Sequence, residues 1–283
     1  MIVQEQGEQL ILIRQTDHAV LSGFFAREWG NDQFIQPAPV ESFRLAATEH
    51  DNGWSEWEIL PQIDPATFLP YTFMSIPTEE HIAIYQRGLE RIVKIDQYAA
   101  LLASMHSAGL YDRTRATMPG FSAKYVKANE MQVVNEFVQR LRLQQLRLKV
   151  DLRGNPITKT YADEKSLQAN VQRLETLDRL SLYFCTTSSG DATIEDVPVD
   201  NQGTEADLDL RREGRDAVTL SPYPFRRDPL NVSILARRVP KRHYADDVDF
   251  QKTLAHAPYA PMKFTLRGGG TRLQTLDVAL NLS

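Results

Sequence analysis

Helical periodicity is the feature that most constrains the fold of this chain. Through most of the first 185 residues, apolar side chains recur every three or four positions, and polar or proline-rich breaks separate the periodic segments. Such segments predict amphipathic helices that each bury one face against a shared core. We expect helices at residues 16–29, 40–51, 78–93, 97–107, 122–148 and 163–185.

Outside this helical body the pattern is that of short strands. Residues 1–15 contain two β-prone runs on either side of Gly7, which predicts a hairpin, and short β-like runs follow Thr186. We therefore predict a mainly α fold, a helical bundle with a short N-terminal β-hairpin and a small strand-rich C-terminal extension. The predicted boundary divides a domain of residues 1–185 from an extension of residues 186–283 that packs on it.

Residues 52–77 interrupt the predicted helices. They contain four prolines and little periodicity, which predicts a long irregular loop. Loops of this length in a folded domain are usually functional or disordered, so this segment is a candidate for the rim of a site.

Composition limits the classes of partner. The 283 residues carry a net charge of −5, which gives no electrostatic basis for binding a nucleic acid. The one cysteine, Cys185, cannot form an internal disulfide and fits a reducing compartment. The N-terminus lacks the basic and apolar segments of a signal peptide, and no apolar run approaches the ~18 residues of a membrane span. We expect a cytoplasmic protein that acts on a small molecule, with neither nucleic acid nor membrane as partner. The sequence leaves a homo-oligomer open.

Asp178 stands on the apolar face of a predicted helix. It lies between Leu174 and Leu182 at helical spacing, so its carboxylate points into the core. A buried carboxylate is costly unless a cation pairs with it or it is neutralised. Two structural alternatives compete with a functional role: pairing with an arginine, or a shifted helix register that exposes Asp178 beside Arg179.

The doublet His50-Asp51 stands at the end of another predicted helix. His50 shares a helix face with Phe43, so its imidazole also points inward. A lone inward histidine is more often a hydrogen-bonded core residue than a ligand. However, an imidazole and a carboxylate together suit Fe, Mn or Zn far better than Ca or Mg.

His81 and His106 provide a geometric test. On one continuous helix they would lie about 37 Å apart. A turn at Asp96, with the aspartate capping a second helix, would instead make them neighbours. With His18 near a predicted helix start, six imidazole and carboxylate groups then occupy inward or helix-end positions. One buried cation or a pair of cations would relieve the cost of burying them all.

These six residues resemble the ligand pattern of the HD-domain superfamily of metal-dependent phosphohydrolases, which is named for its His-Asp doublet. The closer resemblance is to the six-ligand, two-metal variant, which includes hydrolases and mixed-valent di-iron oxygenases related to inositol oxygenase. Gly53 after the doublet and the segment 178–181 also match the family's pattern. The resemblance covers about residues 10–185, and the whole chain is similar to an uncharacterised bacterial domain family of this kind.

The resemblance implies a dinuclear centre in which Asp51 bridges the two metals and is the catalytic residue. The first metal would be held by His18, His50, Asp51 and Asp178, and the second by Asp51, His81 and His106. The implied cofactors are two divalent or mixed-valent transition-metal ions, with Fe favoured and Mn or Zn as alternatives. A bridging hydroxide would attack a phosphoester, or an iron pair would activate O₂.

One residue departs from the family pattern. Many two-metal members carry a lysine after the glycine, where it addresses an anionic substrate group or the metal-bound water, and here Trp54 takes that place. Three functions therefore stay open. A hydrolase of a phosphoester or related small molecule is favoured because hydrolases are common in the superfamily. The alternatives are an oxygenase acting on a small organic substrate and a non-catalytic regulatory metal-binding module.

Basic side chains that follow His106 are candidates for a substrate rim. They are Arg113, Arg115, Lys124 and Lys127, with no acidic residue between them. They predict either an anion-binding rim or a solvated basic face. Trp54, also a candidate rim residue, could instead close over an organic substrate with Trp57 and Phe68. Among the other candidates, Cys185 is expected in the core and His243 and His256 on the surface.

Overall fold

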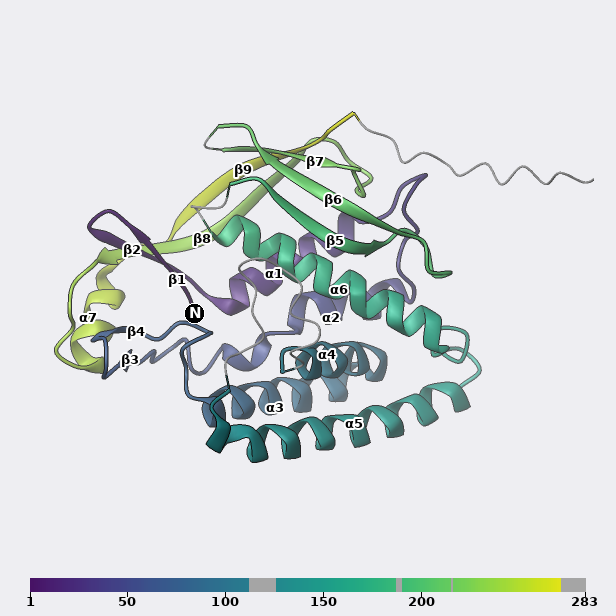
Figure 1. The fold of residues 1–283 in the computed structure, drawn as a ribbon, viewed down its shortest axis with the longest axis horizontal. Helices are drawn as coiled ribbons and strands as arrows, with labels where there is room; N and C mark the ends of the chain where they lie inside the picture. The colour runs from purple at the N-terminus through teal and green to yellow at the C-terminus, as the bar shows by residue number, and fades with distance from the viewer. Residues whose placement is uncertain (112–125, 187–189, 215, 271–283) are drawn as a thin grey trace, which may run out of the picture.

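A curved seven-stranded sheet lies over a set of helices in the computed structural model (Figure 1). The structure describes residues 1–111, 126–186, 190–214 and 216–270. Its helices are α1 (Gln15–Glu28), α2 (Val40–Glu49), α3 (Thr78–Ile95), α4 (Gln97–Gly109), α5 (Met131–Gly154), α6 (Glu164–Cys185) and α7 (Asp247–His256), with short 3-10 turns η1 (Asn52–Trp54) and η3 (Ala128–Glu130). Its strands are β1 (Ile2–Gln6), β2 (Gln9–Ile13), β3 (Ile63–Asp64), β4 (Leu69–Pro70), β5 (Ala192–Pro198), β6 (Glu205–Arg212), β7 (Ala217–Ser221), β8 (Leu230–Pro240) and β9 (Ala260–Gly268).

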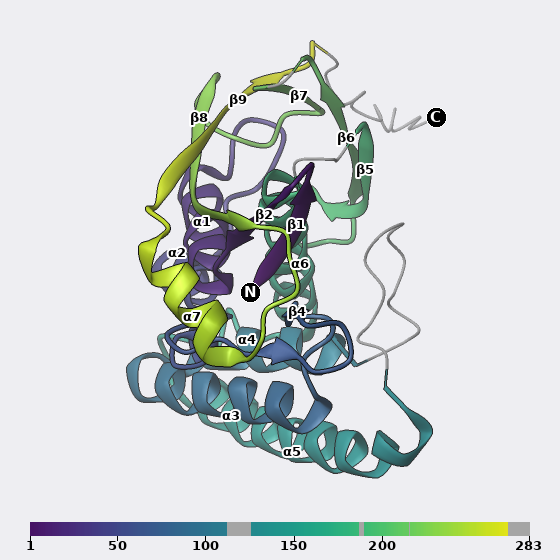
Figure 2. The same ribbon diagram turned by 90° about the vertical axis from the view of Figure 1, so that its left-hand side faces the viewer.

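The helices form two levels beneath the sheet (Figures 1 and 2). Helices α1 and α6 pack on each other and lie closest to the sheet, α1 against β8 and α6 against β5. Helices α3, α4 and α5 lie on the side away from the sheet, and α2 packs on both α1 and α4. Helices α1, α2, α4 and α6 therefore contact one another in the middle of the molecule, where all four contribute to the candidate site.

The expected mainly α fold, with a short hairpin and a small strand-rich extension, is wrong. The large sheet has the order β1-β2-β8-β9-β7-β6-β5, so the N-terminal hairpin and the C-terminal strands belong to one sheet. Strand β2 pairs antiparallel with β8, with Leu10 opposite Val239, and β7 pairs parallel with β9. The pairing of β2 with β8 crosses the boundary expected at residue 186.

The composition of β2 explains why the hairpin does not stand alone. Leu10, Ile11, Leu12 and Ile13 are all buried, so the strand is covered on both faces. Ile11 and Ile13 pack in the main core, and Leu10 and Leu12 pack in a second buried cluster on the opposite face. A continuous apolar run of this kind is typical of a strand with both faces covered. The backbone edge of β2 pairs with β8, which also contributes to both clusters.

Aromatic rings join the sheet to the helices in one core. Phe25 of α1 packs against Phe184 of α6 and Phe225 of the β7–β8 connection, with ring centroids 5.8 and 5.5 Å apart. Phe184 in turn contacts Phe264 of β9 at 5.2 Å. Helical and sheet residues thus belong to the same buried cluster.

Two elements were not expected from the sequence. In β6, Leu208 and Leu210 are the buried residues among charged neighbours, so its apolar signal is weak. Helix α7 begins at an aspartate cap, where Asp246 accepts from the backbone N–H of Asp249. The segment expected to be irregular, residues 52–77, contains η1 and the β3–β4 pair.

The turn between α3 and α4 is the one that would bring His81 and His106 together. Helix α3 ends at Ile95, and the Asp96 carboxylate accepts from the backbone N–H of Ala99 at 2.8 Å to begin α4. The same carboxylate accepts from the hydroxyl of Ser42 at 2.7 Å, which ties the turn to α2. The alternative of one straight helix is excluded.

Candidate metal centre

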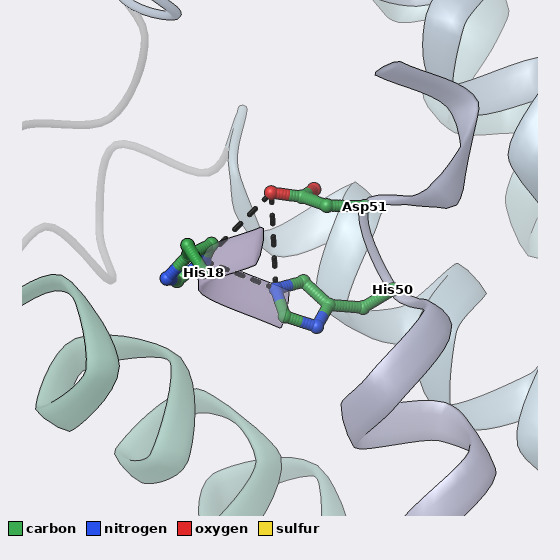
Figure 3. Close-up of side chains that lie close together, drawn as sticks. All are labelled: His18, His50 and Asp51. Atoms are coloured by element: carbon green, nitrogen blue, oxygen red, sulfur yellow. Dashed lines mark hydrogen bonds and ion pairs between the residues drawn. The ribbon is translucent and has the colours of Figure 1, made fainter. Parts of the chain in front are cut away.

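Five of the six side chains expected at a metal site meet in the middle of the helical layer. His18 comes from α1, His50 from the end of α2, Asp51 from the turn before η1, His106 from α4 and Asp178 from α6. Their ligand atoms form two overlapping groups, His18–His50–Asp51 and His50–His106–Asp178, each with all atoms within 4.8 Å of one another. Figure 3 shows the first group, with His18, His50 and Asp51 pointing toward one another.

The distances among four of these residues match the edges of a coordination shell. Nε2 of His18 lies 2.9 Å from Asp178 Oδ1 and 3.4 Å from Nε2 of His50, which is 3.3 Å from the same carboxylate oxygen. Asp51 Oδ2 lies 3.8 Å from each Nε2. Ligand bonds of about 2.1 Å separate neighbouring ligands by about 3.0 Å in an octahedron and about 3.4 Å in a tetrahedron. The atoms of His18, His50 and Asp178 therefore have the spacing that one transition-metal ion requires, and Asp51 Oδ2 lies beside them at a slightly longer distance.

Hydrogen bonds fix which ring nitrogen of each histidine faces the centre. Nδ1 of His50 lies 3.0 Å from the carbonyl of Ala47, which can only accept, so Nδ1 carries the proton. The Ser181 hydroxyl lies 2.6 Å from Nδ1 of His18 and 2.8 Å from the carbonyl of Asp178, so it can accept from Nδ1 while donating to that carbonyl. When each ring carries its single proton on Nδ1, both Nε2 atoms direct a lone pair at the centre, as in metal sites where a second partner sets the tautomer.

With both imidazoles neutral, hydrogen-bond acceptors face one another at this centre. Two imidazole lone pairs and two carboxylates converge in a buried site, and His18, His50 and Asp51 each expose 3% or less of their surface. Such a set is unfavourable unless positive charge lies within it, supplied by protons on the imidazoles or by a metal cation. Nitrogen and oxygen donors in this mixture fit Fe, Mn or Zn.

The pKa values reflect the same requirement. Burial acts to lower the pKa of His50, but Asp51 and Asp178 outweigh it and raise the value to about 9. Burial acts to raise the pKa of Asp178, but hydrogen bonds from His18 and His50 hold it well below its ordinary range. Burial lowers the pKa of His106 to about 4, so this imidazole is neutral at pH 7.

Asp51 is held through both carboxylate oxygens. Oδ2 accepts from the Gln15 amide at 3.1 Å, and Oδ1 accepts from the Tyr85 hydroxyl at 2.8 Å. Gln15 opens α1, where its backbone N–H donates to Glu58 at 2.5 Å. Burial raises the pKa of Glu58, whose carboxylate also accepts from the Thr16 hydroxyl.

His81 lies apart from both ligand groups found within the described residues. Its Nδ1 is 2.6 Å from the Tyr111 hydroxyl, and its ring packs 4.8 Å from that of Tyr85 and 5.7 Å from that of Trp54. His106 instead lies beside His50, with ring centroids 5.2 Å apart. The resemblance implies that His81 and His106 bind the same metal. In the structure His106 instead groups with His50 and Asp178, and His81 lies apart from them.

Asp178 faces two histidines of the candidate centre. Its carboxylate contacts His18 and His50, and its side chain is 13% exposed. It is neither paired with an arginine in these contacts nor turned to the surface beside Arg179.

Sequence reasoning missed Gln15, Glu58, Tyr85, Tyr111 and Ser181. Three of them carried a signal at helical spacing, because Gln15 precedes His18 by three residues, Tyr85 follows His81 by four and Ser181 follows Asp178 by three. Glu58 and Tyr111 have no such spacing to a predicted ligand.

The expected substrate rim is only partly described. Trp54 is fully buried, with its ring 5.7 Å from that of Trp57, so it lines the interior beside His81. Lys127 is exposed and begins η3, where its backbone N–H donates to Glu130. Arg113, Arg115 and Lys124 lie outside the described residues.

Three further expectations are confirmed. Cys185 is fully buried, and His243 and His256 are exposed.

No helix among the described residues is long and apolar enough to cross a membrane. No curated protein and no solved structure matches the chain. The family model described as "Protein of unknown function (DUF3891)" matches residues 1–241, from the hairpin through β8 and across the boundary at residue 186. The chain belongs to this family.

Proposed function

We propose that this protein is a metal-dependent hydrolase of a phosphoester or a related small molecule. The observation that carries the proposal is the convergence of two imidazole lone pairs and two carboxylates, from His18, His50, Asp51 and Asp178, at coordination distances. The resemblance of these ligands to the HD-domain pattern supports the same chemistry. Fe is the favoured metal, with Mn and Zn as alternatives.

A bound transition-metal ion would supply a water molecule whose pKa is lowered to about 7, together with a positive charge for an anionic substrate. The chain's own residues would hold and orient this centre. Gln15 and Tyr85 fix the two oxygens of Asp51, and Ala47 and Ser181 fix the rings of His50 and His18. His106, whose ring is neutral at pH 7 and lies beside that of His50, would bind the metal or accept a proton at the ring nitrogen that carries none.

An oxygenase is the second candidate, and one observation favours it. Trp54 stands where many two-metal relatives of the HD type carry a lysine, and its buried ring lies beside His81. This substitution replaces a group that would bind a phosphate with an apolar surface suited to an organic substrate. A cytoplasmic setting is also part of our proposal, supported by the single cysteine of the chain.

The test is turnover by protein of known metal content. Protein purified anaerobically would be loaded with Fe²⁺, Mn²⁺ or Zn²⁺, analysed for metal, and assayed with bis(4-nitrophenyl) phosphate and 4-nitrophenyl phosphate. We expect hydrolysis that depends on the metal and falls at least a hundredfold in Asp51→Ala. His256→Ala, which changes an exposed histidine away from the centre, is the control.

The alternatives give different results. Consumption of O₂ by the iron form with an organic substrate, without phosphoester hydrolysis, would favour the oxygenase. Tight metal binding without either activity would favour the regulatory module.

A further inference from the structure

The two oxygens of Asp51 have different surroundings. Oδ2 faces Nε2 of His18 and of His50, at 3.8 Å from each, so it belongs to the proposed metal centre. Oδ1 accepts a hydrogen bond from the Tyr85 hydroxyl at 2.8 Å. A carboxylate that bridges two metals through both oxygens offers one to each, and here the second oxygen accepts a hydrogen bond from a phenol.

Tyr85 lies between Asp51 and the histidine that a second metal would use. Its side chain is buried, with 5% of the residue exposed, and its ring packs against that of His81 at 4.8 Å. Because Tyr85 follows His81 by one turn of α3, both side chains extend from the same face of this helix. The phenol therefore reaches Asp51 from the same side as His81.

The two histidines expected at a second metal do not share a position. The ligand atom of His106 groups with those of His50 and Asp178, on the side of the first metal. Nδ1 of His81 is bonded to the Tyr111 hydroxyl at 2.6 Å. Of the groups expected at a second metal, His81 and Oδ1 of Asp51 lie beside Tyr85, whose hydroxyl donates to that carboxylate oxygen.

We infer that this protein holds one metal ion where the two-metal pattern that it resembles holds two, because the Tyr85 hydroxyl takes the place of the second cation at Asp51. This inference rests on the metal site of the proposed function. The hydroxyl donates one hydrogen bond to Oδ1, which partly balances the negative charge that a second cation would neutralise. Tyr85 is thus a residue that sets the number of metals and positions the carboxylate for the first.

The experiment measures metal content after reconstitution. Wild-type protein and Tyr85→Phe would be stripped with a chelator, loaded with excess Mn²⁺, passed through a desalting column and analysed for Mn per chain. Electron paramagnetic resonance distinguishes an isolated Mn²⁺ ion from an exchange-coupled pair. Tyr98→Phe is the matched control, because this buried tyrosine of α4 bonds to Asn170 and not to the metal centre.

We expect one Mn²⁺ per chain and an uncoupled signal in the wild type and in Tyr98→Phe. Tyr85→Phe should bind a second ion and give a coupled signal, and adding His81→Ala to it should restore a single ion. Circular dichroism and melting curves confirm that each variant is folded before it is loaded.

Other results overturn the inference in distinguishable ways. Two ions in the wild type would contradict it and leave the proposed hydrolase intact. One ion in folded Tyr85→Phe would show that the hydroxyl does not exclude the second cation. No bound metal in the wild type would overturn both this inference and the proposed function.

Discussion

Ser181 contacts the nitrogen of His18 that faces away from the candidate metal centre. Its hydroxyl lies 2.6 Å from Nδ1 of His18, from which it can accept, and donates to the carbonyl of Asp178 at 2.8 Å. In Ser181→Ala this acceptor is lost, so the ring can adopt the other tautomer or rotate. We expect metal binding to weaken by about 10- to 100-fold, the usual effect of removing such a partner, as measured by competition with a chelating dye.

A matched serine provides the control. Ser107 is also buried in a helix, where its hydroxyl donates to the carbonyl of Ala103 at 2.8 Å. Ser107→Ala should leave the metal affinity unchanged. Equal effects of the two substitutions would show that Ser181 acts only through helix packing.

The buried histidines predict the pH dependence of stability in metal-free protein. The pKa of His50 is raised from 6.5 to about 9, so its contribution is complete below pH 6.5 and is lost as the pH rises through 9. The pKa of His106 is lowered from 6.5 to about 4, so its contribution is present above pH 6.5 and is lost as the pH falls through 4. Each shift corresponds to about 3 kcal/mol over its window.

Urea unfolding of chelator-treated protein from pH 4 to pH 9.5 should therefore show greatest stability near pH 6.5. Protein with saturating Zn²⁺ should keep its stability between pH 6.5 and 9, because metal binding replaces the proton of His50. His106→Asn should reduce the loss of stability below pH 6.5 and leave the loss above pH 6.5 unchanged. A metal-free protein that gains stability from pH 6.5 to 9 would contradict the charged state of His50.

At the scale of single residues, the sequence predicted the histidines and Asp178 because their positions on helices imply burial. The groups that orient them were not predictable in the same way. Gln15 donates to Asp51, and Glu58 accepts from the backbone of Gln15 at the start of α1. Both contacts form because α1 packs on the turn after α2, and no periodicity in the sequence predicts that packing. The exclusion of a second metal depends on one hydroxyl of Tyr85, which a ligand pattern does not include.

At the scale of elements, the close approach of η1 to α3 places Asp51. A Cβ on Gly53 would lie 1.9 Å from the carbonyl oxygen of Ile84 and 3.0 Å from the backbone nitrogen of Gly88. Gly53→Ala must therefore push η1 from α3 and carry Asp51 with it. Overpacking of this kind costs about 1–3 kcal/mol, and we expect a loss of that size in urea unfolding together with weaker metal retention.

Gly154→Ala is the comparison for this prediction. The glycine ends α5, and nothing lies within 4 Å of an added Cβ. This variant should match or slightly exceed the wild type in stability and keep its metal. If Gly53→Ala behaved in the same way, the contact of η1 with α3 would not position the centre.

The helices were predictable element by element, and the sheet was not. Amphipathic periodicity gives the start of α4 at Gln97 and the cap of α6 at Asp163, because these signals are local. Sheet pairing is non-local. Strand β2 meets β8 more than two hundred residues later, and the apolar run Leu10–Ile13 shows only that some partner must cover it.

At the scale of the whole molecule, the helical layer and the sheet depend on each other. The Phe25–Phe184–Phe264 contacts join α1, α6 and β9, and α1 and α6 also carry His18 and Asp178. The ligands are thus fixed by a core that includes the C-terminal strands. The match to the family covers α1, α6 and β8 but ends at residue 241, before β9.

Metal binding should therefore stabilise the whole molecule and not only the centre. An ion that binds the folded state alone adds about 2.7 kcal/mol at a hundredfold excess over its dissociation constant, which corresponds to roughly 5 °C in melting temperature for a chain of this size. Chelation of protein shown to be loaded should lower the melting temperature by that amount in one cooperative step. Asp51→Ala should remove most of this sensitivity, because the variant lacks a ligand, whereas His243→Ala and His256→Ala should retain it. A melting curve that chelation leaves unmoved would mean that protons, not a metal, balance the buried carboxylates, since the acceptors around Asp178 need one or the other.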